Sequence, residues 1–190
     1  VKSAADYGEC RQLLASTPVF AALSDDALKP ILASASRLHI DSGEMLFSEG
    51  QTAEHFFLVR QGCLEMLRFS NAGEERVFQL FRRGQLIAEA AMFMTHGRYP
   101  MNARGQCASQ LYRFSRATLR KACASHPNLA MHMLENLSQR LYQHVNEVEW
   151  LTASSASQRL AAYLLALHQR QGDALNLPIS QRQLATHLGI

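Results

Sequence analysis

Hydrophobic residues between Thr17 and Arg113 come in short runs that are separated by glycines. Two of these runs, 55–59 and 76–81, are rich in Phe and Val, which is typical of β-strands bounded by turns. The close spacing of the runs predicts a sandwich or a barrel. Between the runs 64–69 and 76–81, the segment Asn71-Ala72-Gly73 predicts a hairpin whose turn needs a positive φ angle. The glycines that divide this region stand at positions 43, 50, 62, 73, 84, 97 and 105.

A long uninterrupted helix is predicted next. Pro127 suits a first helical turn, and neither Gly nor Pro recurs before Gly172. Apolar residues from Met131 to Leu151 fall on the a and d positions of a heptad repeat, and His144 takes the one polar d position. This predicts the seam of a parallel coiled-coil dimer; the alternative is a stripe that packs on the chain's own barrel. The seam residues are Leu134, Leu137, Leu141, Val148 and Leu151.

Serines mark the starts of the shorter helices. Ser24 precedes two acidic residues and is expected to cap a helix at 27–36. Residues 154–157 predict a loop and cap before a helix at 158–169. Ser180 is expected to cap a last helix, which ends at Gly189.

Composition indicates a folded protein without a disulfide framework. The 190 residues are 47% hydrophobic and 18% charged, and the net charge is only +3, too small by itself to indicate a nucleic-acid binder. The chain has no apolar run of the ~20 residues that a membrane span needs, and its first ten residues lack the apolar core of a signal peptide. The four cysteines are widely scattered. We therefore expect a cytoplasmic protein, with no membrane partner, whose cysteines are reduced and serve as small apolar residues.

Motifs in the barrel region resemble a known family. Segments 42–47, 56–59 and 84–89, together with Glu49-Gly50 and Gly62, resemble the cyclic-nucleotide-binding-type barrel. The long helix and the segment 179–185 then resemble the CRP/FNR family of bacterial transcription regulators. Segments 88–94 and 109–115 are most similar to its Dnr branch, which is associated with denitrification and with nitric oxide sensing through haem.

This resemblance implies an α+β fold in four parts. These are an N-terminal segment (1–16), a sensor β-barrel of the double-stranded jelly-roll type (17–126), a dimerisation helix (127–151) and a partial winged helix-turn-helix (152–190). It also implies a homodimer that binds palindromic double-stranded DNA and contacts RNA polymerase. In the family a recognition helix follows the Gly-Ile at 189–190. We therefore expect a truncated DNA-binding domain in a chain that folds and dimerises but binds DNA poorly.

One departure from the family argues against cyclic AMP. Members that bind it place an Arg followed by Ser or Thr on the cyclic phosphate, because a guanidinium pairs well with a phosphodiester. The matching positions here are Tyr99 and Pro100, which supply neither a cation nor, for the proline, an N–H group. Glu89 would repel a phosphate, and Arg98 is one residue out of place. A cyclic-nucleotide-binding regulator therefore stays an alternative only.

Haem is the effector group that the residues favour. An apolar pocket between barrel and long helix suits a porphyrin, bound without covalent links because the sequence has no C-x-x-C-H motif. His187 is the candidate iron ligand, although most of the eight histidines are expected to be surface or structural residues. Iron–sulfur members of the family carry several cysteines near the N-terminus, whereas this sequence has only Cys10 there. No iron–sulfur cluster is therefore expected. The predicted effector-pocket residues are Glu89, Met92, Phe93, Tyr99, Pro100 and Leu134.

DNA contacts are expected from Ser180, Gln181 and Arg182, which open the first helix of the predicted motif, where caps and cations contact phosphates. An enzyme of the cupin type is disfavoured because the sequence has no His-x-His metal motif, and it also has no nucleophile elbow or P-loop. A scaffold that only binds a ligand would share the barrel, but it would not need the dimer helix or the residues after Ser180.

Overall fold

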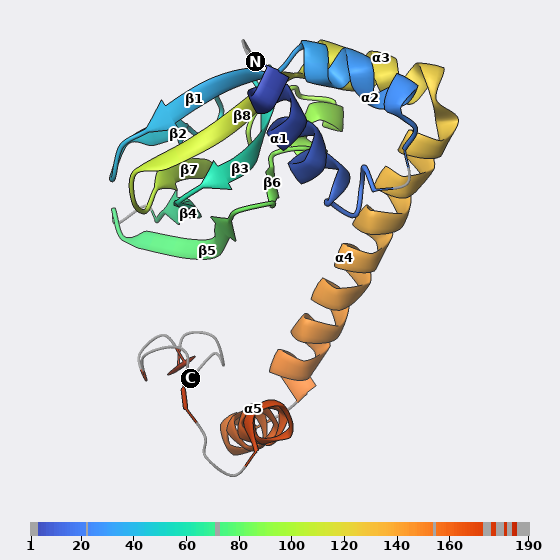
Figure 1. Ribbon diagram of the computed structural model, residues 1–190. Helices are drawn as coiled ribbons and strands as arrows, with labels where there is room; N and C mark the ends of the chain where they lie inside the picture. The colour runs from blue at the N-terminus through green and yellow to red at the C-terminus, as the bar shows by residue number, and fades with distance from the viewer. Residues whose placement is uncertain are drawn as a thin grey trace. The chain divides into compact units, whose positions relative to one another are not determined.

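The computed structural model describes residues 4–21, 23–70, 73–153, 155–172, 176–177, 181 and 184–185. The chain divides into two compact units, Val1–Asn136 and Leu137–Ile190, which are described separately below. Figure 1 shows the strands of the first unit in two sheets, with α2 and α3 side by side at one end.

The first unit is an antiparallel sandwich of two four-stranded sheets. Their strand orders are β1-β8-β3-β6 and β2-β7-β4-β5. The glycine-bounded runs form strands as predicted, and the hairpin of β4 and β5 pairs Phe69 with Glu75 across Gly73, whose φ is 80°. The strands are β1 (Ser36–Ile40), β2 (Met45–Phe47), β3 (His55–Gln61), β4 (Cys63–Phe69), β5 (Glu75–Arg82), β6 (Leu86–Ile87), β7 (Asn102–Gly105) and β8 (Ser109–Ser115).

The core of the sandwich consists of aromatic and aliphatic side chains from both sheets. Phe56 stacks on Phe114 with ring centroids 4.9 Å apart and on Phe20 at 6.3 Å. Gly62 joins β3 to β4 with a φ of +93°, and a Cβ there would lie 2.2 Å from the hydroxyl oxygen of Ser109. Only glycine fits this tight connection, because both the backbone angle and the space exclude a side chain. Fully buried members of the core include Leu58, Leu64, Leu67, Ile87, Leu111 and Tyr112.

Helix α1 (Ala4–Ala15) lies in the segment 1–16, for which the sequence pattern predicted no helix. Its Cys10 and Leu14 are completely buried. The buried Asp6 accepts hydrogen bonds from the Tyr112 hydroxyl at 3.0 Å and from Nε of Arg37 at 2.6 Å. The segment therefore belongs to the same compact unit as the sandwich.

Helix α2 (Asp25–Ala33) begins two residues before the predicted start and ends three before the predicted end. Ser24 is its N-cap residue, but the serine side chain makes no capping hydrogen bond. The early end has a simple cause: Ser36 already begins β1, where it pairs with Arg113. After the sandwich come the short helix η1 (Ala90–Phe93) within the β6–β7 connection and α3 (Arg116–Ser125) directly after β8.

Helix α4 (Pro127–Ala153) confirms the prediction of a long helix, and α5 (Ala156–Gln171) follows it. Ser155 caps α5 through a capping box: its hydroxyl accepts the Gln158 N–H at 3.3 Å, and the Gln158 side chain accepts the Ser155 N–H at 2.8 Å. Most of the predicted helix-turn-helix, including Ser180, Arg182 and His187, lies outside the described residues. No winged helix-turn-helix is therefore evident in the part of the chain that the structure describes.

Candidate functional site

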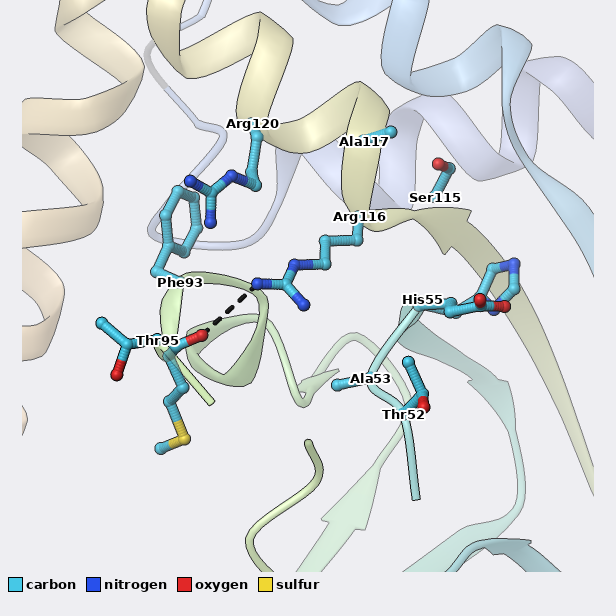
Figure 2. A pocket seen from close by; sticks show the side chains of 11 residues that line it. Thr52, Ala53, His55, Phe93, Thr95, Ser115, Arg116, Ala117 and Arg120 are labelled. Atoms are coloured by element: carbon cyan, nitrogen blue, oxygen red, sulfur yellow. Dashed lines mark hydrogen bonds between the residues drawn. The ribbon is translucent and has the colours of Figure 1, made fainter. Parts of the chain in front are cut away.

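The first unit contains a cavity of about 960 Å³ between the start of β3, η1 and the start of α3. Figure 2 shows His55 at one end and Phe93 at the other, with Arg116 between them. Small-molecule sites typically measure ~300–1,000 Å³, so the cavity has the size of a binding site. Its lining residues are Thr52, Ala53, Glu54, His55, Phe93, Met94, Thr95, Ser115, Arg116, Ala117 and Arg120.

Backbone hydrogen bonds join the walls of this cavity. The Ala53 N–H donates to the Gly97 carbonyl at 2.8 Å, which ties the loop before β3 to the loop after η1. The Arg116 N–H donates to the Glu54 carbonyl at 2.8 Å, which ties the same loop to the first turn of α3. Three segments that are distant in sequence are thereby held around one space.

Two arginines of α3 form the cationic side of the cavity. Nη2 of Arg116 donates to the Met94 carbonyl at 3.3 Å, and Nη1 of Arg120 donates to the Met92 carbonyl at 3.4 Å. The Arg120 guanidinium also lies 6.0 Å from the centroid of the Phe93 ring, within reach of a cation–π interaction. The arginines therefore connect α3 to the backbone of η1 and of Met94, the residue that follows it.

The histidine of the cavity is held neutral. Burial lowers the pKa of His55 from its ordinary 6.5, and the nearby Arg113 lowers it further. At pH 7 its imidazole is therefore uncharged, the form in which a ring nitrogen binds a metal ion. The acidic lining residue Glu54 is exposed to solvent.

The six predicted effector-pocket residues do not line one common cavity in the described part of the chain. Phe93 lines the cavity of Figure 2 and is 38% exposed. Glu89, Met92 and Tyr99 are buried, Pro100 is half-buried and Leu134 is 57% exposed. Sequence reasoning did not select His55, Arg116 or Arg120. The only local signal was the i, i+4 spacing of two arginines just after a strand.

Tyr99 fills the sandwich interior next to β2 and β3. Its ring stacks on Phe47 with centroids 3.8 Å apart. Its hydroxyl donates to the His55 carbonyl at 2.7 Å and accepts the His55 N–H at 3.4 Å. Burial raises the pKa of Tyr99, so this side chain stays neutral. The neighbouring Arg98 is exposed and donates to the Gly50 carbonyl at 2.6 Å.

The predicted dimer residues of α4 form an exposed stripe. Leu134, Leu137, Leu141 and Val148 are 57%, 36%, 66% and 60% exposed. The side chain of Leu151 lies outside the described part of the chain. Of the predicted DNA-contacting residues only Gln181 is described, and it is exposed.

Metal and cysteine chemistry finds little support among the described residues. No three His, Cys, Asp or Glu side chains of that part of the chain are grouped so that they could hold a metal ion. Cys10 and Cys63 are buried and Cys123 is half-buried, and burial raises the pKa of each thiol. Cys107 is exposed, which corrects the expectation that all four are packed as small apolar residues.

Within the described residues, no helix has both the length and the hydropathy of a membrane span.

Comparisons with known proteins agree with this architecture. The family model of the cyclic nucleotide-binding domain matches residues 37–126. The nitrogen fixation regulation protein FixK of Bradyrhizobium diazoefficiens is 24% identical over an alignment of 160 positions, which covers 81% of this chain and 66% of FixK. The chain thus spans slightly less than two thirds of that relative.

Structures of the transcriptional regulator DNR from Pseudomonas aeruginosa are also similar. The DNR sensor domain matches with a TM-score of 0.68 and 32% identity, over 76% of this chain and 96% of that domain. A longer DNR structure matches with a TM-score of 0.62 and 34% identity, over 95% of this chain and 81% of the DNR chain. Identity of this level, spread over the sandwich and the helices that follow it, identifies the family. The chain belongs to the CRP/FNR family of transcription regulators, which are not enzymes.

Proposed function

We propose that this protein is a homodimeric, DNA-binding transcription regulator in which an effector at the sandwich changes how two copies of α4 pair. The observation that carries the proposal is the architecture: an effector-type sandwich leads through α3 directly into a 27-residue helix with an exposed apolar stripe. An effector that favours one pairing of α4 would then change DNA affinity, and DNA would change effector affinity by the same factor.

A second copy of the chain is the partner that the α4 stripe fits. Leu134, Leu141 and Val148 repeat every seven residues, and Leu137 occupies the intervening d position. Leu134, Leu141 and Val148 are each more than half exposed. Covering them with the same stripe of a second copy would remove apolar surface from water and stabilise the dimer. Two-fold symmetry then predicts a palindromic operator with half-sites about one helical turn apart.

The effector group in this proposal is haem, with nitric oxide as the signal. The likeness to DNR supports this choice, and so does the chemistry of the cavity. His55 and Met94 carry donor atoms that iron accepts, and Phe93 offers an aromatic surface to a porphyrin. When bound, haem iron supplies a coordination position for a diatomic gas. His187 stays a second predicted ligand, outside the described residues.

Cyclic AMP is the competing effector, because the cyclic nucleotide-binding family model matches the sandwich. Tyr99 argues against it. Its neutral ring occupies the matching position for the phosphate-binding arginine and is fixed there by Phe47 and the His55 backbone. A phosphodiester placed beside it would lose its hydration without gaining a cation.

In the same proposal, Ser180, Gln181 and Arg182 contact DNA phosphates at the start of the helix-turn-helix. RNA polymerase is the further partner, and the cytoplasm is where both DNA and polymerase are available. Selection of bound sequences from a random duplex pool tests this part with the full-length protein. We expect enrichment of a palindrome; a pool that stays random after repeated selection would refute DNA recognition.

A haem titration tests the effector. We expect a Soret band displaced from that of free haem, a further shift on adding nitric oxide, and no heat of binding with cyclic AMP. His55→Ala and Met94→Ala should weaken haem binding if haem occupies the cavity of Figure 2. His39→Ala is the control, because His39 is exposed on β1, bonds to Asp41 and does not line that cavity. A band that stays at the free-haem position, or tight uptake of cyclic AMP, would overturn the proposed effector.

A further inference from the structure

We propose that the cavity between β3, η1 and α3 binds an amphipathic organic carboxylate, with Arg116 and Arg120 as the carboxylate clamp. This deepens the proposed function, because it assigns the groups that hold the effector's acidic end. It requires neither iron nor nitric oxide, so its test is independent of theirs.

The two arginines form one cationic surface. Arg116 and Arg120 are four residues apart on α3, so their side chains lie on the same face of the helix, and both line the cavity. Each guanidinium carries five N–H groups, but the described contacts use only one nitrogen of each, to a backbone carbonyl. Neither forms an ion pair with a carboxylate of the described residues. Both therefore retain donors for an anion.

The part of the lining next to the two arginines is apolar. The Phe93 ring is 38% exposed, and Met94 is half-buried beside it. Figure 2 shows Phe93 adjacent to the Arg120 side chain, with Arg116 reaching toward the same region. A ligand with a flat apolar body and an acidic end would cover Phe93 while its oxygens meet the guanidinium groups. An inorganic anion would use only the arginines and leave the aromatic ring exposed.

Carboxylate geometry suits this pair. A guanidinium presents two parallel N–H groups that match the two oxygens of a carboxylate, and such charge-assisted pairs are stronger than neutral hydrogen bonds. Thr52, Thr95 and Ser115 add hydroxyl groups to the lining. The cavity volume of about 960 Å³ admits a body as large as a porphyrin dicarboxylate.

Binding at this site would act on the link between η1 and α3. A carboxylate that draws the guanidinium groups toward itself competes with the carbonyls of Met92 and Met94. Helix α3 ends at Ser125 and α4 begins at Pro127, so a shift of α3 reaches the start of α4 through one residue.

Protoporphyrin IX and its dimethyl ester test the clamp, because they share the flat body but the ester lacks the carboxylate charge. We expect the native protein, followed by porphyrin fluorescence, to bind the free acid about tenfold or more tightly than the diester. The double variant R116A/R120A should lose this preference. K121A is the matched control: Lys121 is an exposed cation on the same helix, it does not line the cavity, and its variant should keep the preference.

Equal affinity of the native protein for acid and diester would overturn the clamp, and so would a preference that survives in R116A/R120A. If the double variant does not fold, the comparison of acid and diester on the native protein still decides. A protein that prefers the acid porphyrin but shows no nitric oxide response would leave the clamp standing and refute the proposed signal. A nitric oxide response without any preference for the acid porphyrin would refute the clamp alone.

Discussion

Replacing Leu141 by alanine is the most direct perturbation of the proposed dimer, because Leu141, at 66%, is the most exposed of the four stripe residues whose side chains the structure describes. Leucine to alanine removes about three carbon atoms, worth ~2.4 kcal/mol when the side chain is fully buried at ~0.8 kcal/mol per CH₂. About two thirds of that, ~1.6 kcal/mol, is gained only when a partner covers the residue. A symmetric dimer contains the site twice, so the loss is ~3 kcal/mol, or ~200-fold in Kd.

Sedimentation velocity over a dilution series measures this change. The control is Tyr142→Ala: Tyr142 is 63% exposed on the same helix but stands outside the a and d positions, so its loss should leave the dimer unchanged. Equal weakening by both substitutions, or a Leu141→Ala protein with unchanged dimer affinity, would refute the seam. A variant that loses unfolding free energy while its mass stays the same would support the alternative, in which the stripe packs within one chain.

Three further predictions test the first unit. Tyr99→Phe removes the hydroxyl that bonds both backbone groups of the residue opening β3, so thermal unfolding should show a loss of ~1–2 kcal/mol; an unchanged Tm would contradict the buried hydrogen bonds. Gly62→Ala should cost ~2 kcal/mol or more in chemical unfolding, whereas Gly43→Ala, with positive φ but open space, should cost only ~1 kcal/mol; equal losses would remove the steric argument. Arg60 lowers the pKa of Glu9 below 4.5, so the stability that this ion pair contributes is present above that pH and is lost as pH falls through the lowered value. Glu9→Gln should therefore reduce the loss of stability on acidification, measured by unfolding between pH 7 and 3. A variant as acid-sensitive as the parent would show that the ion pair does not contribute to stability.

Local signals in the sequence predicted much of the fold. The hairpin of β4 and β5 follows from a turn sequence between two apolar runs, and α4 from a long stretch without Gly or Pro. The segment 154–157 was predicted to contain the cap of the next helix, and the capping residue is Ser155, whose bonds reach only to Gln158; α5 itself begins two residues before the predicted start. Helix α1 was missed because its sequence has almost no amphipathic pattern; it is fixed by distant partners such as Tyr112.

The cavity could not be predicted in the same way, because its lining comes from three segments that only the folded chain brings together. Arg116 looks like an ordinary surface cation until its contact with the Met94 carbonyl is known. That Tyr99 supplies no cation for a phosphate follows from its identity alone, so the sequence was enough for this prediction. Which space it fills depends on Phe47, more than fifty residues away in the chain.

His126 alone separates α3 from α4, and its N–H is already bonded to the Ala122 carbonyl at 2.8 Å. With a single connecting residue, a rotation of α3 must also move the start of α4. Inserting a few glycines between α3 and α4 would leave ligand binding and dimer formation intact, but ligand binding would no longer affect dimer pairing. Natural relatives with insertions at this point should therefore be regulators that no longer respond to what they bind.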